Sequence, residues 1–342
     1  MPRIILHAGM HKTGTSSIQA TLHRADLSGS GFSYPDLGWE NHSTPLSLIF
    51  REDPSRWHFV RRRGWTAAEL AAERARCERR LEAALEAADG RTLVLSAEGI
   101  GGLGPRELEA LAERLARYGT VEAIAYVRDP AGYAASSLQG LLRNGVTEFD
   151  AHLAKPIYRP RFETLERVLT REAVQYIAFD PPAFPGRCVV TDICGRMGLP
   201  LKPADIVRRN DSLTREANGL LYLYYRQFPD AGRPGRLIRR LRTLDGPPLR
   251  LAASLLAAPM RAIEDDIRWM ASRVDVPVAP PQTDAAAIRS VDELAEVSDD
   301  SLRWVAAQLG VSYRLRWRAA RDPAVAARWL RRLTALELPA DP

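Results

Sequence analysis

The sequence predicts an α/β protein with a mostly parallel sheet flanked by helices. Over the first two hundred residues, short apolar, β-rich runs alternate with longer helical patterns, as they do in parallel α/β folds. The chain is 46% hydrophobic and 26% charged, which is ordinary for a protein that buries a sizeable core. Beyond about residue 200 the pattern becomes mainly helical. We therefore expect one enlarged domain over residues 1–342, with an α/β core over 1–200 and a helical extension over 201–342.

Each element of the core has a local signal. The strands are expected at Arg3–His7, Thr92–Ser96, Val121–Val127 and Val174–Phe179. The helices between them are expected at Thr66–Ala88, Pro105–Tyr118 and Pro130–Arg143. The first of these helices has its apolar residues along one face, and the other two begin with proline, a helix-start signal. A segment from about Gly29 to Arg63 breaks the alternation and is too long for a simple connection. Such an insertion indicates function or disorder.

Composition narrows the partners only weakly. The net charge of +6 suits acidic ligands, but only three of the 48 basic residues are lysines, Lys12, Lys155 and Lys202. This skew indicates a coding bias toward arginine. The three cysteines show neither a CxxC pair nor Cys/His metal spacing, so we expect no metal site and no disulfide framework. Without a secretion signal or a membrane-spanning run, we expect a cytoplasmic protein. Peripheral membrane contact and the oligomeric state stay open.

A glycine-rich loop connects the first expected strand to a helical pattern that starts at Ile18. The loop reads His-Ala-Gly-Met-His-Lys-Thr-Gly-Thr-Ser-Ser from His7 to Ser17. After a strand and before a helix, backbone N–H groups and the helix dipole favour an anion, and Lys12 adds a full positive charge. Gly14 allows the backbone to turn with a positive φ. The loop therefore predicts a fold of the P-loop-containing nucleotide-binding type.

The loop is not a Walker A motif, because Lys12 precedes Gly14 instead of following a glycine. That departure, and the lack of a convincing metal-binding aspartate after a hydrophobic strand, argue against a P-loop kinase that uses ATP and Mg²⁺. The kinase remains the alternative among enzymes. The arginine content alone would suit a nucleic-acid-binding protein, but no helix-turn-helix, RRM or zinc pattern supports one. We therefore expect no nucleic-acid partner.

From His7 to Gln19 the sequence resembles the 5′-phosphosulfate loop of bacterial sulfotransferases, which use 3′-phosphoadenosine-5′-phosphosulfate (PAPS). The resemblance implies transfer of a sulfuryl group to an acceptor hydroxyl or amine, without a metal, and release of adenosine 3′,5′-bisphosphate. It implies that Lys12 contacts the bridging oxygen of the phosphosulfate. The other residues that it implies around the 5′-phosphosulfate are His11, Thr13, Gly14, Thr15, Ser16 and Ser17. Of these, His11 would mainly shape the loop.

A second anion site is expected after the strand Val121–Val127. Arg128 follows that strand, and Ser136 comes eight residues later in the next helix. An arginine and a serine placed in this way can converge on one phosphate. Sulfotransferases carry such a pair at the same spacing for the 3′-phosphate, so the resemblance implies this role for Arg128 and Ser136. The late Arg-Lys-Gly element of the cytosolic enzymes is missing, and Arg208–Ser212 is either a substitute for it or a solvated segment.

Transfer also needs a base for the acceptor's proton, and the family uses His or Glu. Glu98 follows the strand Thr92–Ser96, so it would lie at the same sheet edge as the Lys12 loop. If Glu98 is not the base, it is an exposed loop carboxylate or a helix cap. His42, in the long insertion, is the other candidate for the base. If it is not the base, it is a surface histidine. The acceptor, expected to be a saccharide, a lipid or a small metabolite, is not readable. The arginines at Arg61–Arg63 and from Arg233 to Arg242 face an anionic saccharide, lipid headgroups or only water.

Overall fold

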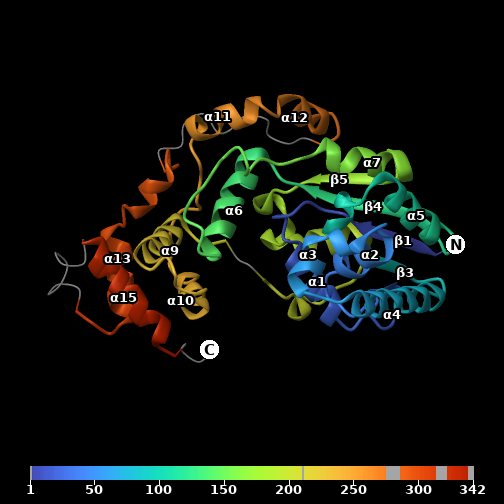
Figure 1. Ribbon diagram of the computed structural model, residues 1–342, viewed down its shortest axis with the longest axis horizontal. Coiled ribbons are helices and arrows are strands. Elements are labelled where there is room, and N and C mark those ends of the chain that lie inside the picture. The colour runs from blue at the N-terminus through green and yellow to red at the C-terminus, as the bar shows by residue number, and fades with distance from the viewer. Residues whose placement is uncertain (1, 210–211, 275–285, 313–321, 338–342) are drawn as a thin grey trace. The chain divides into compact units, whose positions relative to one another are not determined.

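The structure, a computed structural model, describes residues 2–209, 212–274, 286–312 and 322–337. By its internal contacts the chain forms two compact units (Figure 1). Unit 1 comprises Met1–Arg128, Ile157–Asn210 and Asp265–Val276. Unit 2 comprises Asp129–Pro156, Asp211–Glu264 and Pro277–Pro342. The two units therefore interleave along the sequence, and the single domain expected over 1–342 stays a prediction.

Unit 1 is built on a five-stranded, all-parallel sheet with the strand order β2-β3-β1-β4-β5. The strands are β1 (Arg3–His7), β2 (Phe32–Ser33), β3 (Thr92–Ser96), β4 (Thr120–Val127) and β5 (Val174–Ala178). The four expected strands are present to within one residue at one end. The short β2 was not predicted, because its two residues lie inside the glycine- and proline-rich insertion. The predicted α/β class with a parallel sheet is confirmed.

Helices cover both faces of this sheet (Figure 1). On one face, Ile5 and Ile177 pack in a buried cluster with residues of α1 and α8. On the other face, the ring of Tyr176 packs edge-on against Phe162 of α7, with ring centroids 5.2 Å apart. This division follows from the alternation of side chains along a strand. The helices of this unit are α1 (Thr15–Arg24), α2 (Ser43–Phe50), α3 (His58–Arg63), α4 (Ala67–Glu86), α5 (Pro105–Ala116), α7 (Arg159–Leu169), α8 (Val189–Met197) and, from its second residue on, α12 (Glu264–Ala271).

The helix starts follow their sequence signals. Thr66 forms a capping box at the start of α4: its hydroxyl accepts from the Glu69 N–H, while the Glu69 carboxylate accepts from the Thr66 N–H at 2.8 Å. Two orphan amides of the first turn are satisfied in this way. The helix α5 begins at Pro105, as expected. The insertion over residues 29–63 also folds, since it contains β2, α2, α3 and a 3-10 turn η1 (Pro54–Arg56).

Unit 2 is helical, in agreement with the helical C-terminal part that the sequence predicts. Its helices are α6 (Pro130–Arg143), α9 (Arg215–Gln227), α10 (Gly235–Leu241), α11 (Ala253–Arg261), α13 (Asp299–Gln308) and α15 (Pro323–Ala335). The buried helix α9 packs against α6 and α15. Asp129 caps α6 by accepting from the Gly132 N–H at 2.7 Å. In the described part of the chain, no helix is both long and apolar enough to cross a membrane.

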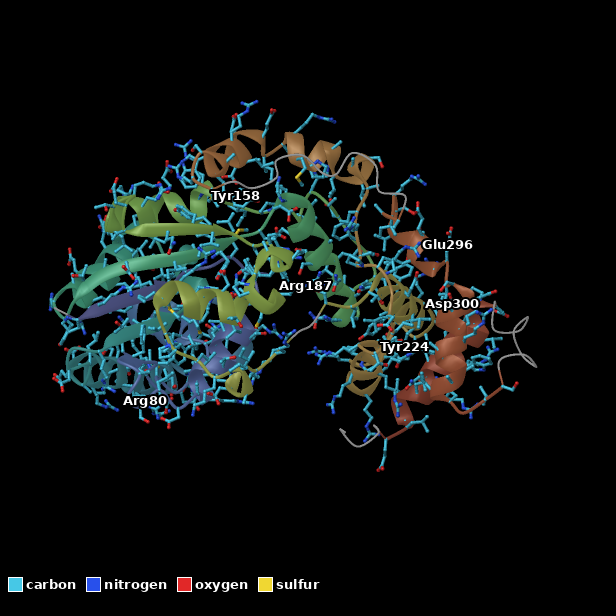
Figure 2. All side chains as sticks on the ribbon, turned by 180° about the vertical axis from the view of Figure 1, so that it is seen from behind. Arg80, Tyr158, Arg187, Tyr224, Glu296 and Asp300 are labelled. Carbon is cyan, nitrogen blue, oxygen red and sulfur yellow. The ribbon has the colours of Figure 1, made fainter. Side chains whose placement is uncertain are left out.

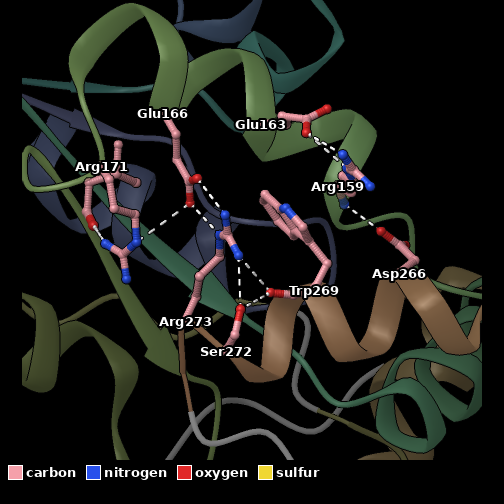
Figure 3. Close-up of polar contacts among 9 residues, drawn as sticks. Arg159, Glu163, Glu166, Arg171, Asp266, Trp269, Ser272 and Arg273 are labelled. Atoms are coloured by element: carbon pink, nitrogen blue, oxygen red, sulfur yellow. Dashed lines mark hydrogen bonds and ion pairs between the residues drawn. The ribbon is translucent and has the colours of Figure 1, made fainter.

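Late in the chain, the segment that contains α12 returns to unit 1 and is clasped to α7 (Figure 3). Arg273 makes two bonds to the Glu166 carboxylate, at 2.6 and 2.9 Å, and its guanidinium carbon lies 3.6 Å from the ring centroid of Trp269. Asp266 accepts from the N–H of Tyr158 at 2.8 Å and from that of Arg159 at 2.5 Å. A carboxylate at this position satisfies the orphan amides of α7 and complements the helix dipole.

Candidate active site

The Lys12 loop connects β1 to α1 and is held against β4. The Ala8 N–H donates to the Ile124 carbonyl at 2.9 Å, and the Met10 N–H donates to the Tyr126 carbonyl at 3.1 Å. Further along, Lys12 and Gly14 both have a positive φ, of 70° and 75°. A left-handed conformation is costly for lysine and tends to mark functional sites. With alternating backbone hands, successive N–H groups can face one anion.

The loop has no room for side chains at its two closest approaches. A Cβ on Gly14 would lie 2.7 Å from Val189 Cγ1, and one on Gly9 would lie 3.0 Å from His7 Nε2. Gly14 is also the N-cap of α1 and therefore offers no side chain to the first-turn amides. The Ser17 N–H donates to the Gly14 carbonyl at 2.9 Å, and the amides of Thr15 and Ser16 can donate to an anion. The arrangement is a backbone cradle at a helix N-terminus.

His7 lies beneath this cradle. Its ring is fully buried, and Nδ1 shares a hydrogen bond of 2.8 Å with the Ser96 hydroxyl. Among the described residues, Nε2 has no hydrogen-bond partner. Burial lowers the pKa of His7 to about 4, against an opposing effect of Glu98, so the ring is neutral at pH 7. A buried polar atom without a partner is costly and rare in native structures. Here it faces Gly9, inside the loop.

Glu98 begins the short 3-10 helix η2 (Glu98–Gly102), directly after β3. Its carboxylate lies 3.3 Å from His11 Nδ1, so the structure brings two residues expected at the site together. Burial by itself would raise the pKa of Glu98, but the hydrogen bond and charge of His11, with Arg161 and His7, outweigh burial and lower the pKa. The carboxylate is therefore ionised at neutral pH. Arg161 of α7 also donates to the Glu98 carbonyl at 2.7 Å.

Arg128, at the end of β4, reaches the same loop. Its Nη1 donates to the Lys12 carbonyl at 2.6 Å, and its guanidinium carbon lies 5.2 Å from the ring centroid of Phe179. The hydroxyl of the buried Tyr158 (Figure 2) donates to the Arg128 carbonyl at 2.7 Å. Because Asp266 holds the Tyr158 N–H, a chain of hydrogen bonds runs from α12 through Tyr158 and Arg128 to the Lys12 loop.

The hydroxyls of the loop divide into two groups. Thr13 donates to the Met10 carbonyl at 2.6 Å, and the Ser17 hydroxyl bonds both the N–H and the carbonyl of Arg209, at 2.9 and 3.1 Å. These two side chains therefore fix the local backbone. Thr15 is buried and Ser16 is half-buried, both in the first turn of α1. Within the expected Arg208–Ser212 element, residues 210 and 211 lie outside the described residues.

His42 occupies a different environment. Its ring is fully buried and stacked on Tyr34, with ring centroids 4.3 Å apart. Nδ1 accepts from the Ser96 N–H at 3.2 Å, so Nε2 carries the proton and donates to the Pro35 carbonyl at 3.0 Å. Burial lowers the pKa of His42 to about 3, although the bond to Pro35 opposes this shift. His42 fastens the insertion to the end of β3.

Ser136 lies half-buried in α6, which belongs to unit 2, whereas Arg128 ends unit 1. Their convergence on one phosphate therefore stays a prediction. In the same helix, the buried Gln139 accepts from the Leu213 N–H at 3.2 Å, so its side chain has a structural role.

Sequence reasoning missed three residues that shape the site, His7, Tyr158 and Arg161. His7 opens the quoted loop, but nothing in the sequence indicates that one of its nitrogens is buried without a partner. Tyr158 and Arg161 lie near the start of α7, about 150 residues after the loop that they serve. Only the return of α7 to the sheet reveals them.

No protein-family model and no curated protein matches the sequence. The structure is similar to three solved structures. A sulfotransferase from Alicyclobacillus acidocaldarius has a TM-score of 0.42 at 14% identity, over 80% of this chain and 95% of that one. A sulfotransferase domain from the olefin synthase of Synechococcus PCC 7002 has a TM-score of 0.31 at 18% identity, over 60% and 76%. A sulfotransferase domain from the curacin biosynthetic pathway has a TM-score of 0.33 at 14% identity, over 91% and 99%.

Proposed function

We propose that this chain is a PAPS-dependent sulfotransferase. The observation that carries the proposal is the meeting of three features at the carboxyl edge of the sheet: the Lys12 loop, the Glu98 carboxylate beside His11, and Arg128 bonded to the Lys12 carbonyl. Open parallel sheets bind their ligands at this edge. The loop can bind an anion through its backbone N–H groups and its lysine. A carboxylate that can accept a proton lies next to the loop.

The residues of the loop fit a phosphosulfate. The side-chain-free approaches at Gly9 and Gly14 let an anion reach the backbone, and the uncapped first turn of α1 provides N–H donors. The unpartnered His7 Nε2 adds a buried polar atom beneath the loop. Arg128, with Ser136 of α6, would hold the 3′-phosphate that distinguishes PAPS from adenosine phosphosulfate.

PAPS would supply a sulfuryl group: the bond from sulfur to the bridging oxygen breaks as the acceptor oxygen bonds to sulfur, and the bridging oxygen leaves with the 5′-phosphate. Lys12 would neutralise the negative charge that grows on that bridging oxygen, an interaction that is strongest in the transition state. Gly14, Thr15 and Ser16 would hold the phosphate through their backbone amides. The acceptor then loses its proton to a base.

We assign the base to Glu98 and not to His42. Glu98 is ionised, partly exposed and oriented by His11. Both nitrogens of His42 are used by backbone groups of Pro35 and Ser96, and its ring is fully buried. A base must come within hydrogen-bond reach of the acceptor's hydroxyl. The partly exposed carboxylate of Glu98 could come that close to an acceptor bound at this edge, whereas His42 would have to leave its place in the fold to do so.

A thermal-shift comparison tests the function. Adenosine 3′,5′-bisphosphate without metal should raise the melting temperature, because a ligand that binds only the folded state stabilises it. ATP with Mg²⁺, or a DNA duplex, should have little effect. Stabilisation by ATP with Mg²⁺ and not by the bisphosphate would instead favour the kinase. A screen for sulfated products from labelled PAPS would then identify the acceptor.

A further inference from the structure

Three aromatic rings lie around Arg63 in and just after the insertion, and a fourth, that of Trp57, is stacked on one of them. Trp57 and Phe59 are stacked with ring centroids 4.9 Å apart, and Phe59 packs edge-on against Trp39 at 5.6 Å and Trp65 at 6.0 Å. The guanidinium carbon of Arg63 lies 5.1 Å from the ring centroids of Trp39 and Phe59, and 5.8 Å from that of Trp65. We call these five residues the Arg63 cluster. All four rings are half-buried, so each keeps some surface in contact with solvent.

The charge beside this cluster is unbalanced. Arg61, Arg62 and Arg63 form the last turn of α3, and all three are exposed. Within the described ranges, none of them makes an ion pair with a carboxylate. Nearby arginines do make such pairs: Arg56 lies 3.6 Å from Asp53, and Arg74 lies 3.4 Å from Glu78. Three exposed guanidinium groups with no carboxylate paired to them in the described part of the chain favour an anionic ligand.

Residues next to Trp39 in the sequence are bonded to elements of the proposed active site. Trp39 precedes Glu40, whose carboxylate makes two bonds to Arg209, at 2.6 and 3.0 Å. The backbone of Arg209 in turn bonds Ser17 at the start of α1. Three residues after Trp39, His42 is bonded to Ser96, at the end of β3. The cluster is therefore connected through hydrogen bonds to the segment that follows the Lys12 loop and to β3, the strand that leads to Glu98.

A cavity of about 600 Å³ adjoins the cluster at Trp65. Its lining includes Trp65 and Arg61 together with Val60, Leu70 and Arg74. This volume lies within the range of roughly 300–1,000 Å³ that is typical of ligand sites. The walls combine apolar side chains with two cations, so they suit a molecule with both C–H faces and negative charge.

We propose that the Arg63 cluster binds the acceptor and that the acceptor is an acidic saccharide. The proposal rests on the proposed function, for which such a molecule supplies the hydroxyl. The electron-rich faces of the rings can stack against the C–H face of a sugar, and the arginines can hold its carboxylate or sulfate groups through paired hydrogen bonds.

A membrane surface fits these observations less well than a saccharide. The rings of the cluster are half-buried and pack against one another, so each presents only part of its surface to a bilayer. The large apolar side chains that are truly exposed in the described residues lie elsewhere, at Val146, Leu153, Ile157 and Leu336. A sugar needs only the exposed part of each ring.

The test uses a galacturonic acid hexamer as the acidic probe and maltohexaose as its neutral counterpart, with binding measured by calorimetry on the full chain. The acidic hexamer should bind the wild-type protein at least about tenfold more tightly than maltohexaose, because a hydrogen bond to a charged group is worth roughly one to two factors of ten. The double variant R61Q/R62Q should lose most of that difference. The matched control R79Q/R117Q replaces two exposed arginines outside the cluster and should bind like the wild type.

Three results would overturn the saccharide site: equal affinity for the two hexamers, unchanged affinity of R61Q/R62Q, or binding of anionic phosphatidylglycerol vesicles in place of the acidic hexamer. The variant Phe59→Leu keeps most of the apolar volume but removes the central ring, so it should weaken the binding of both hexamers. Adenosine 3′,5′-bisphosphate should stabilise R61Q/R62Q as it does the wild type, and a loss of that effect would assign the cluster to the donor. If wild-type protein binds the acidic hexamer but not the bisphosphate, the saccharide site stands and the sulfotransferase function fails.

Discussion

Two ionisable side chains meet the end of β3 from different segments, and their environments are opposite. Glu98 follows the strand, keeps 20% of its side chain exposed, and faces His11. His42 comes from the insertion, is fully buried, and gives both ring nitrogens to backbone groups. Burial lowers the pKa of His42 and keeps its ring neutral, whereas His11 and Arg161 outweigh burial and keep Glu98 ionised. Two ionisable groups beside the same strand end therefore differ in charge because their burial and their partners differ.

The variant Glu98→Gln tests this contrast most directly. It keeps the shape of the side chain but removes its charge, so we expect turnover to fall by about 10²–10⁴-fold, the usual contribution of a general base. The stabilisation by adenosine 3′,5′-bisphosphate should be unchanged. Rates are measured with labelled PAPS once an acceptor is known. If His42→Asn loses turnover per folded molecule while Glu98→Gln does not, the assignment of the two residues must be reversed.

Replacement of Lys12 should produce the next largest loss. Lys12→Ala removes the charge that would stabilise the leaving bridging oxygen, so we expect turnover to drop by about 10²–10³-fold. The melting temperature without ligand should stay close to that of the wild type, because Lys12 is exposed. Lys202→Ala, at an exposed position of unit 1, is the control. Near-normal turnover of Lys12→Ala would remove this lysine from the chemistry.

Arg128 and Ser136 should act on affinity more than on rate. Arg128→Ala should weaken binding of adenosine 3′,5′-bisphosphate by roughly 10- to 100-fold, since a hydrogen bond to a charged group is worth about 1.5–3 kcal/mol. Ser136→Ala should cost only a few-fold, because its donor is neutral. Calorimetry with the bisphosphate and with adenosine 5′-monophosphate separates the contribution of the 3′-phosphate. A wild-type preference between these nucleotides in both variants would mean that the second anion site lies elsewhere.

The two buried histidines, His7 and His42, should make the free energy of unfolding depend on pH, and replacement of His42 should barely affect turnover. The pKa is lowered to about 4 for His7 and to about 3 for His42, so between those values and the ordinary 6.5 the unfolded chain binds more protons than the folded one. The free energy of unfolding should therefore fall as the pH falls from about 6.5, by up to about 1.4 kcal/mol per pH unit for each histidine. Below about pH 4 the contribution of His7 levels off.

Urea unfolding at pH 7, 6 and 5 measures this slope. His42→Gln should be less stable at pH 7, because its bonds to Pro35 and Ser96 are disturbed, and should show a shallower dependence on pH. The control His58→Gln changes an exposed residue and should keep the wild-type slope. A slope that is unaffected by His42→Gln would show that this ring is protonated as easily in the fold as outside it.

The sequence predicts the frame of this site better than its details. Alternating β-rich and helical patterns place four strands, and prolines mark the starts of α5 and α6, because these signals are local. The position of Glu98 follows from the strand before it. The burial of His42 depends on its bond to Ser96, which is 54 residues away, and the contacts of Arg128 depend on Tyr158, which is 30 residues away. Such features arise from packing between distant segments, which no local pattern encodes.

The contacts between α12 and α7 determine when, during synthesis, the structure around Arg128 can be completed. Glu166 and Arg273 are separated by 107 residues, and Tyr158 and Asp266 by 108. While the chain grows from its N-terminus, α7 has no Asp266 cap until about residue 266 has left the ribosome. By then the segments Asp129–Pro156 and Asp211–Glu264 of unit 2 already exist. The support that Tyr158 gives to Arg128 is therefore completed late in synthesis, after much of unit 2 has been made.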